Sequence, residues 1–270
     1  MLIDTVHKLS YLRCMVQWID THTHFGMLEE GDEKGLELAK AQGVHKMINI
    51  GTNPDDFEPV YAFAQKHYPT VFCTLGVHPH DAKVYDDRVD LYLRNKAKNK
   101  EVVAIGEIGL DYYYMNSSKE EQRMAFERQL QVAADLGLPV EIHTRDAEPD
   151  TLEILKKFEG RVKGLLHCFT GTQWLADEAL KIGFNISISG VVTFKNAEEL
   201  RNIVKSLPLD RIHVETDAPF LAPVPQRGKK NTPAFVTHVG EFVAQLKGVT
   251  PEELSAQIEK NTRALFSKFV

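Results

Sequence analysis

The stretch Val102-Val-Ala-Ile-Gly-Glu107 decides the fold, because it is a short apolar run that ends in a carboxylate. The run is rich in Val and Ile and lacks strict polar alternation, which is typical of a strand buried on both faces of a parallel sheet. Seven further runs of this kind recur along the chain, each about one β/α unit after the last. The expected strands are Gln17–Thr21, Val44–Ile50, Val71–Val77, Val102–Gly106, Pro139–Ile142, Gly164–His167, Phe184–Ser187 and Arg211–Glu215.

Amphipathic segments such as Lys119–Leu136 and Thr151–Phe158 lie between these runs and predict helices. Gly43, Gly137 and Gly183 each fall between a helical pattern and the next strand, where a left-handed cap is typical. Eight strands that each lead into a helix predict a closed (β/α)8 barrel, the TIM barrel, whose usual size is roughly 250 residues. An open doubly wound sheet is the alternative, although no Gly-rich nucleotide loop follows the first strand.

No linker, low-complexity tract or charge block divides the chain, so residues 15–270 are expected to form one domain. Residues 1–14 are either a short N-terminal extension or the product of a start site placed too far upstream, and we assign them no chemistry. The three cysteines, Cys14, Cys73 and Cys168, are too few for a disulfide framework. Cys73 and Cys168 lie in apolar runs and are expected to be buried free thiols, which favours a reducing compartment.

The net charge of −6 would repel a polyanion at long range, so any contact with nucleic acid must come from bound cations or a local basic cluster. The loop Arg227-Gly-Lys-Lys-Asn231 is the compact basic cluster beyond the eighth predicted strand. No stretch approaches the length of a membrane-spanning helix, and the N-terminus lacks the continuous apolar block of a secretory signal. We therefore expect a cytoplasmic protein with no membrane partner.

Six side chains that can bind metal fall at or just beyond the ends of the predicted strands. His22 and His24 are two residues apart in extended backbone, so both imidazoles project to the same side. The carboxyl ends of barrel strands meet at one mouth, so distant ligands converge there. The predicted ligands are His22, His24, Glu107, His143, His167 and Asp217.

Imidazole favours zinc-like ions, whereas carboxylates also suit magnesium and manganese. Six ligands are too many for one catalytic ion that keeps an open position, but they suit two ions roughly 3.5–4 Å apart that share a carboxylate. We therefore expect two divalent metal ions, Mg²⁺, Mn²⁺ or Zn²⁺. The predicted division is His22, His24 and Asp217 on one ion, His143 and His167 on the other, and Glu107 between them.

A pair of ions lowers the pKa of water and stabilises charge on a phosphoryl or carbonyl oxygen, which predicts a hydrolase. Asp217 is the candidate for orienting or deprotonating that water, and Glu107 is the second catalytic candidate.

The candidate substrate-binding residues are His78, which follows the third strand, and Arg145, whose fork suits a phosphate. The alternatives are a turn histidine satisfied by backbone and an arginine paired with Asp111 or Asp146. The tyrosines that follow Asp111 offer a stacking face for a base, or else pack within their loop.

Taken together, these stretches resemble the TatD family of metal-dependent hydrolases, within the amidohydrolase-like barrels. The resemblance spans Met15 to the C-terminus, with the motifs in family order. It implies a TIM barrel with metal ligands at the six positions and a deoxyribonuclease activity, often exonucleolytic, that divalent cations support. The matching stretches are Ile19-Asp-Thr-His-Thr-His24, Gly76-Val-His-Pro-His80, Ile105-Gly-Glu-Ile-Gly-Leu-Asp-Tyr112, Ile142-His-Thr-Arg-Asp-Ala147, His167-Cys-Phe-Thr-Gly171 and Glu215-Thr-Asp-Ala-Pro-Phe-Leu-Ala-Pro223.

Glu141 and His213 depart from the family pattern, because relatives usually carry aliphatic residues at these inward-facing strand positions. A buried Glu needs a partner, so a contact between Glu141 and His213 is our hypothesis. Glu215 shares strand parity with Asp217 and is expected one layer deeper, where it would support a ligand.

Three functions remain open after the sequence alone. The first is a phosphodiesterase that acts on DNA, and the second is a hydrolase of a small amide, an ester or aminoacyl-tRNA. The third is a non-catalytic binding module with a structural metal, which is less favoured because a structural site is normally coordinatively closed. No obligate protein partner is expected, because one chain supplies every ligand.

Overall fold

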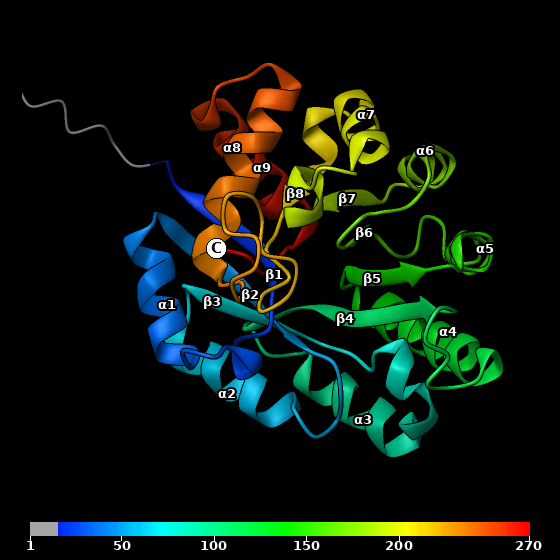
Figure 1. The fold of residues 1–270 in the computed structure, drawn as a ribbon. Coiled ribbons are helices and arrows are strands. Elements are labelled where there is room, and N and C mark those ends of the chain that lie inside the picture. The colour runs from blue at the N-terminus through cyan, green and yellow to red at the C-terminus, as the bar shows by residue number, and fades with distance from the viewer. Residues whose placement is uncertain (1–15) are drawn as a thin grey trace, which may run out of the picture.

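The computed structural model describes residues 16–270, so the segment 1–14 with Cys14 lies outside the described residues. Eight parallel strands form one sheet in which every strand pairs with its neighbour in the chain, and helices surround the sheet as an outer ring (Figure 1). The predicted barrel is therefore confirmed. The strands are β1 (Trp18–Thr23), β2 (Val44–Gly51), β3 (Val71–Leu75), β4 (Val102–Asp111), β5 (Val140–Arg145), β6 (Gly164–Leu166), β7 (Asn185–Ile188) and β8 (Ile212–Val214).

Each of the first seven strands is followed by one α-helix, and β8 is followed by two. Across the described chain, no helix is both long and apolar enough to cross a membrane. The α-helices are α1 (Asp32–Ala41), α2 (Phe57–His67), α3 (Asp87–Lys96), α4 (Lys119–Leu136), α5 (Glu148–Lys156), α6 (Gln173–Lys181), α7 (Glu198–Ser206), α8 (Val236–Lys247) and α9 (Pro251–Leu265). Short 3-10 helices are η1 (Phe25–Met27), η2 (Pro79–Val84), η3 (Gly190–Thr193), η4 (Leu209–Arg211) and η5 (Pro233–Phe235).

The local sequence determines where helix α4 begins and ends, and a side chain of this helix holds the end of β4 at the mouth of the barrel. Ser118 and Glu121 form a capping box at its start, and Gly137 ends it in the left-handed conformation. The buried Gln122 side chain accepts a hydrogen bond from the Asp111 N–H (2.8 Å) and donates one to the Asp111 carbonyl (2.9 Å). The helix therefore holds the last residue of β4 in place.

The barrel closes between β1 and the segment that follows β8. The Asp217 N–H donates to the His22 carbonyl (3.0 Å), and the His24 N–H donates to the Ala218 carbonyl (2.9 Å). Thr23 and Ala218 form a parallel bridge. These contacts exclude the open sheet, and they bring Asp217 beside the two histidines of β1.

Strand β4 is longer than the sequence indicated, because it continues past Gly106 to Asp111. Its pairing with β5 shifts register between Ile105 and Ile108 and resumes with Ile108 opposite Ile142, which places Gly109 opposite His143. Gly109 has φ +145°, and a Cβ built there would lie 1.9 Å from the His143 carbonyl oxygen. Because only glycine fits this approach, β4 carries both Glu107 and Asp111 to the mouth.

Gly109→Ala is predicted to destabilise the protein by about 3 kcal/mol or more, since it combines a strained φ with a backbone clash. Gly137→Ala is the matched control, because its φ is +64° but nothing lies within 4 Å of the added Cβ. That control should lose only about 1–2 kcal/mol. Urea unfolding measures both values, and equal losses would contradict the close approach of β4 to β5.

Candidate metal centre

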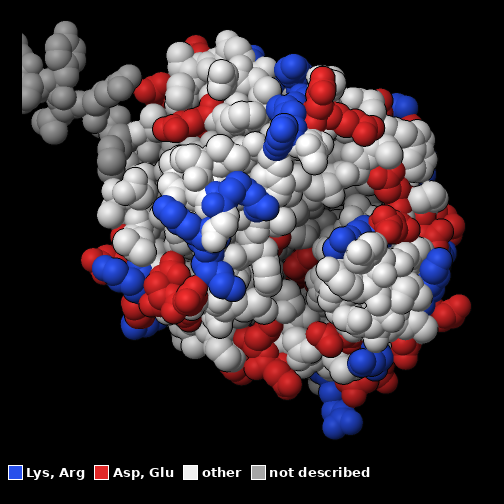
Figure 2. Space-filling model, viewed as in Figure 1, with Lys and Arg blue, Asp and Glu red and all other residues white. Residues whose placement is uncertain are grey.

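A cavity of about 570 Å³ opens at the carboxyl ends of the strands. Figure 2 shows this face hollowed at its centre, with acidic atoms at the floor and basic side chains at the border. The fully buried His22 lies beneath the lining, at 0% exposure. The other five predicted ligands line the cavity: His24, Glu107, His143, His167 and Asp217.

Glu107 occupies the centre of the cluster and is only 3% exposed. Its Oε1 lies 2.8 Å from His167 Nε2 and 3.0 Å from His143 Nδ1. The same oxygen is 3.4 Å from His78 Nε2, and Oε2 is 3.6 Å from His22 Nε2. One carboxylate thus faces four imidazoles. Candidate ligand atoms of Glu107, His143 and His78 all lie within 4.8 Å of one another.

A second group of candidate ligands comes from the closure of the barrel. His22 Nε2 and His24 Nε2 are 3.2 Å apart, as expected for residues on the same side of β1. Asp217 Oδ1 lies 3.4 Å from His24 Nε2 and 3.8 Å from His22 Nε2. These three side chains therefore present one nitrogen or oxygen each to a shared position.

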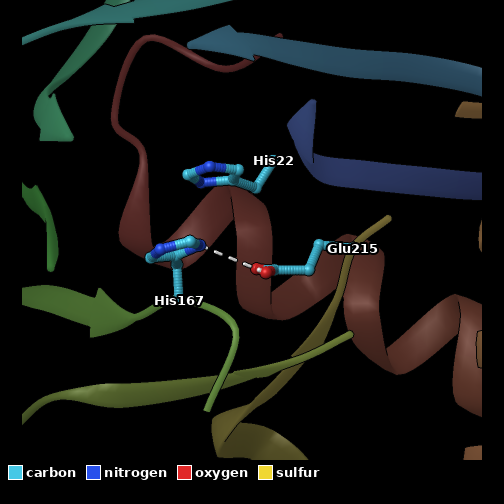
Figure 3. Close-up of side chains that lie close together, drawn as sticks. All are labelled: His22, His167 and Glu215. Carbon is cyan, nitrogen blue, oxygen red and sulfur yellow. Dashed lines mark hydrogen bonds and ion pairs between the residues drawn. The ribbon is translucent and has the colours of Figure 1, made fainter. Parts of the chain in front are cut away.

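The rings of His22 and His167 stack, with centroids 3.9 Å apart and planes 13° apart (Figure 3). A nitrogen lone pair lies in the plane of its ring. Stacked rings therefore direct their lone pairs along parallel lines, toward two neighbouring positions rather than one. Although both imidazoles lie near Glu215, this geometry does not favour a single ion held by these three residues.

A buried carboxylate lies behind His22, at the nitrogen that faces away from the mouth. Glu141 Oε2 is 2.9 Å from His22 Nδ1, and neither side chain is exposed. The hypothesis of a Glu141–His213 contact is wrong, because His213 lies 2.9 Å from the Asn185 amide and 3.4 Å from the Thr262 hydroxyl. Glu141 reaches His22 beneath the mouth, whereas His213 contacts Asn185 of β7, Thr262 of α9 and Phe266. Alternation along a strand does not reveal which neighbours a side chain meets.

Two further imidazoles have carboxylates behind them. Glu215 Oε1 lies 3.3 Å from His167 Nδ1, and the role of Glu215 in supporting a ligand stays a prediction. Asp111 Oδ2 lies 3.0 Å from His143 Nε2 and 3.1 Å from His80 Nε2. Sequence reasoning did not assign Asp111 to the site, although its place in the Gly-Leu-Asp-Tyr motif was the available signal.

Five buried carboxylates surround the floor of the cavity. Within residues 16–270, no Lys or Arg forms an ion pair with any of them. Burying a charge without compensation is costly, so this region needs cations or protons. Imidazoles and carboxylates at these spacings are a donor set that divalent metals accept, and the residues fit a metal centre. The carboxylates are Asp20, Glu107, Asp111, Glu141 and Glu215.

The pKa values divide the imidazoles of the cluster into two groups. Burial by itself would lower the pKa of His24, His143 and His167, but neighbouring carboxylates raise it, so these three side chains hold a proton that a metal would displace. Burial by itself would raise the pKa of Glu107, but His167 and His78 lower it well below the usual value, so the carboxylate is charged. Burial and the neighbouring His167 hold the pKa of His22 well below its usual value. Burial also lowers the pKa of His78 to about 4. Neutral imidazole is the form that binds metal.

Arg145 lies at the border of the cavity and is exposed. Its guanidinium is 3.9 Å from the centre of the Tyr113 ring and 4.8 Å from that of Tyr114. The alternative ion pair with Asp111 or Asp146 is absent from the described part of the chain. Stacking leaves the planar fork of Arg145 available to an anion.

The cysteines and the basic loop complete the comparison with the sequence analysis. Cys73 is buried as expected, but Cys168 is only partly buried and lines the cavity, with its Sγ 3.1 Å from the Ser189 hydroxyl. In the basic loop, the guanidinium of Arg227 stacks 3.9 Å from the centre of the Phe194 ring.

Comparisons with known proteins agree with this geometry. The family model described as TatD related DNase matches residues 19–267. The chain is 41% identical over 256 residues to the uncharacterized metal-dependent hydrolase YcfH of Escherichia coli K12, covering 92% of this chain and 95% of that protein. It is 40% identical over 239 residues to the 3'-5' ssDNA/RNA exonuclease TatD of Cronobacter sakazakii, covering 86% and 90%.

A solved structure shows the same architecture. The crystal structure of YjjV, a TatD homolog from Escherichia coli K12, superposes with a TM-score of 0.87 at 29% identity. The alignment covers 94% of this chain and 99% of that one. The chain therefore belongs to the TatD family and is a metal-dependent hydrolase.

Proposed function

We propose that this protein hydrolyses phosphodiester bonds of DNA, as an exonuclease, with two divalent cations held at the mouth of the barrel. The observation that carries the proposal is the buried Glu107 carboxylate, which faces four imidazoles in a region without a compensating Lys or Arg among the described residues. The name of the Cronobacter relative, an exonuclease of single-stranded DNA and RNA, supports the substrate class.

The positions of the imidazoles support two ions rather than one. The stacked rings of His22 and His167 are 3.9 Å apart, close to the roughly 3.5–4 Å that separates the ions of two-metal hydrolases. Nε2 of His22 faces Oε2 of Glu107 and Nε2 of His167 faces Oε1, so this carboxylate would offer one oxygen to each ion. The proposed ligands are His22, His24 and Asp217 for one ion, His143 and His167 for the other, and Glu107 for both.

When bound, such ions make water a nucleophile at neutral pH and offset charge on the phosphoryl oxygens. We assign to Asp217 the orientation of the attacking water and the acceptance of its proton, since its side chain lines the cavity and is 14% exposed. Its backbone N–H is fixed to the His22 carbonyl, which limits the movement of the carboxylate relative to the imidazoles. His78 and Arg145 line the same cavity and are the proposed contacts to the substrate.

The border of the cavity suits the end of a nucleic-acid strand. Arg145 offers two parallel N–H donors to a phosphate. The neighbouring Tyr113 and Tyr114 side chains are 57% and 54% exposed, so a base could reach the parts of their rings that Arg145 does not cover. A volume of about 570 Å³ is in the range of pockets that enclose one small ligand. A strand end fits such a cavity better than the middle of a duplex does.

Glu107→Gln is predicted to lower kcat for DNA cleavage by about a thousandfold or more, because an amide cannot share its charge between two cations. Release of nucleotides from fluorescent single-stranded DNA with Mn²⁺ or Mg²⁺ measures this effect, and circular dichroism checks the fold. Glu101→Gln is the matched control, since Glu101 is buried just before β4, at the opposite end of the strand.

Three outcomes of that assay carry different meanings. Cleavage by the Glu107 variant at the wild-type rate would indicate a contaminating nuclease and contradict the proposal. Wild-type protein that hydrolyses small esters or amides but not DNA would favour the alternative function, which includes aminoacyl bonds. Loss of activity in the Glu107 variant but not in the Glu101 variant supports phosphodiester hydrolysis at this centre.

Removal of metal is predicted to abolish activity and to lower the unfolding midpoint, because the buried carboxylates then repel one another. Dialysis against a chelator followed by addition of Mn²⁺, Mg²⁺ or Zn²⁺ should restore both properties. At a hundred times the dissociation constant a bound ion stabilises the fold by about 2.7 kcal/mol, which corresponds to roughly 5–10 °C for a chain of this size. A midpoint that ignores both chelator and metal would argue against any ion at the mouth.

Arg145→Met is predicted to raise KM for DNA about tenfold while changing kcat less than about threefold, since it removes a phosphate contact and leaves the metal ligands in place. Arg123→Met serves as the control, because Arg123 is paired with Asp150 and Glu153 outside the cavity. Steady-state kinetics at several salt concentrations separates the two variants. Equal KM values for wild type and the Arg145 variant would remove Arg145 from the substrate site.

A further inference from the structure

We propose that Glu141 is a positioning residue that supports only one of the two cations, the one assigned to His22, His24 and Asp217. This inference rests on the ligand division of the proposed function. Glu141 is not itself a candidate ligand, because no group of ligand atoms that converge on one position includes it. It acts instead through His22, from the side opposite the mouth.

The contact fixes which nitrogen of His22 faces the cation. Glu141 Oε2 lies 2.9 Å from Nδ1 of His22, while Nε2 of the same ring faces His24 Nε2 at 3.2 Å. We infer that Nδ1 of His22 donates its hydrogen to this carboxylate, because that tautomer leaves the lone pair of Nε2 directed to the mouth. Such a carboxylate–histidine–metal arrangement fixes the tautomer and the orientation of the ring, and it makes the imidazole a stronger ligand.

The two proposed ions differ in how many of their histidine ligands contact a carboxylate. The Nδ1 atom of His24 is buried and has no hydrogen-bond partner among the described residues. Glu141 is therefore the one carboxylate that stands behind an imidazole of the first ion. The second ion has two imidazoles with such support, in the pairs His143–Asp111 and His167–Glu215. Loss of Glu141 should consequently weaken the first ion far more than the second.

The surroundings of Glu141 argue against a purely structural role. The side chain is fully buried, and its contact with His22 is the one side-chain hydrogen bond that the described residues give it, because Oε1 has no partner. A buried carboxylate retained for stability alone would be expected to satisfy both oxygens. Gly106 leaves room for it, since a Cβ at that position would lie 2.8 Å from the Cβ of Glu141.

The test is calorimetric titration of metal-stripped wild type, Glu141→Val and Glu141→Gln with Mn²⁺. Wild type should bind two ions. Glu141→Val should bind one of them about 10- to 100-fold more weakly and leave the other within about threefold. Glu141→Gln should fall between, since its amide oxygen still accepts from Nδ1–H but carries no charge. Because Gln has nearly the shape of Glu, this variant decides the matter if the valine variant does not fold.

The tautomer of His22 gives a second measurement that needs no metal and no activity. Imidazole ¹⁵N chemical shifts should place the hydrogen of His22 on Nδ1 in wild type, and this preference should be lost in Glu141→Val. His213→Gln is the control for loss of a buried polar group in the barrel away from the mouth, and it should leave both affinities and the His22 tautomer unchanged.

The outcomes separate the inference from the function on which it rests. Wild-type affinities for both ions in Glu141→Val, or equal weakening of both ions, would overturn the role of Glu141 and leave the two-ion centre intact. Wild-type protein that binds no divalent ion would overturn the centre and this inference together. Selective loss of one ion, with a changed His22 tautomer, supports the inference.

Discussion

The concentration of carboxylates beneath the mouth of the barrel is the constraint on which the rest of the structure depends. Five of them are buried, and histidines are the ionisable groups placed to balance them. The penalty for each uncompensated buried ion is several kcal/mol, so the fold tolerates this cluster only with cations or protons bound. The imidazoles can supply either kind of positive charge, because the same side chains accept protons and bind divalent metals. A metal centre therefore resolves an electrostatic conflict that the fold itself creates.

The barrel supplies the geometry that makes this balance possible. Asp217 meets the histidines of β1 because the backbone after β8 pairs with β1 when the barrel closes. Glu107 meets His143 because β4 and β5 approach so closely that only Gly109 fits between them. The positions of the candidate ligands are thus set by backbone hydrogen bonds between strands, which hold side chains more rigidly than flexible loops do.

Much of this could be predicted from the sequence, and the errors have specific physical causes. The apolar runs predicted all eight strands, because strands buried on both faces lack polar residues. The same rule misplaced the end of β4, since Glu107 and Asp111 are polar residues inside the strand. Alternation predicted that Glu141 points inward, but the layer it occupies depends on the stagger of neighbouring strands, which one strand does not encode. Its partner therefore had to come from the structure.

The charge distribution connects the metal centre to the acidic composition of the chain. A mouth whose floor carries so many carboxylates would repel a phosphodiester, and the net charge of −6 adds to that repulsion. Two divalent cations at the proposed positions would offset most of the negative charge at the floor, and Arg145 lines the same cavity. The proposed ions would then be required for the substrate to bind as well as for its hydrolysis. An acidic protein can act on a polyanion in this way, because attraction is confined to the one place where chemistry occurs.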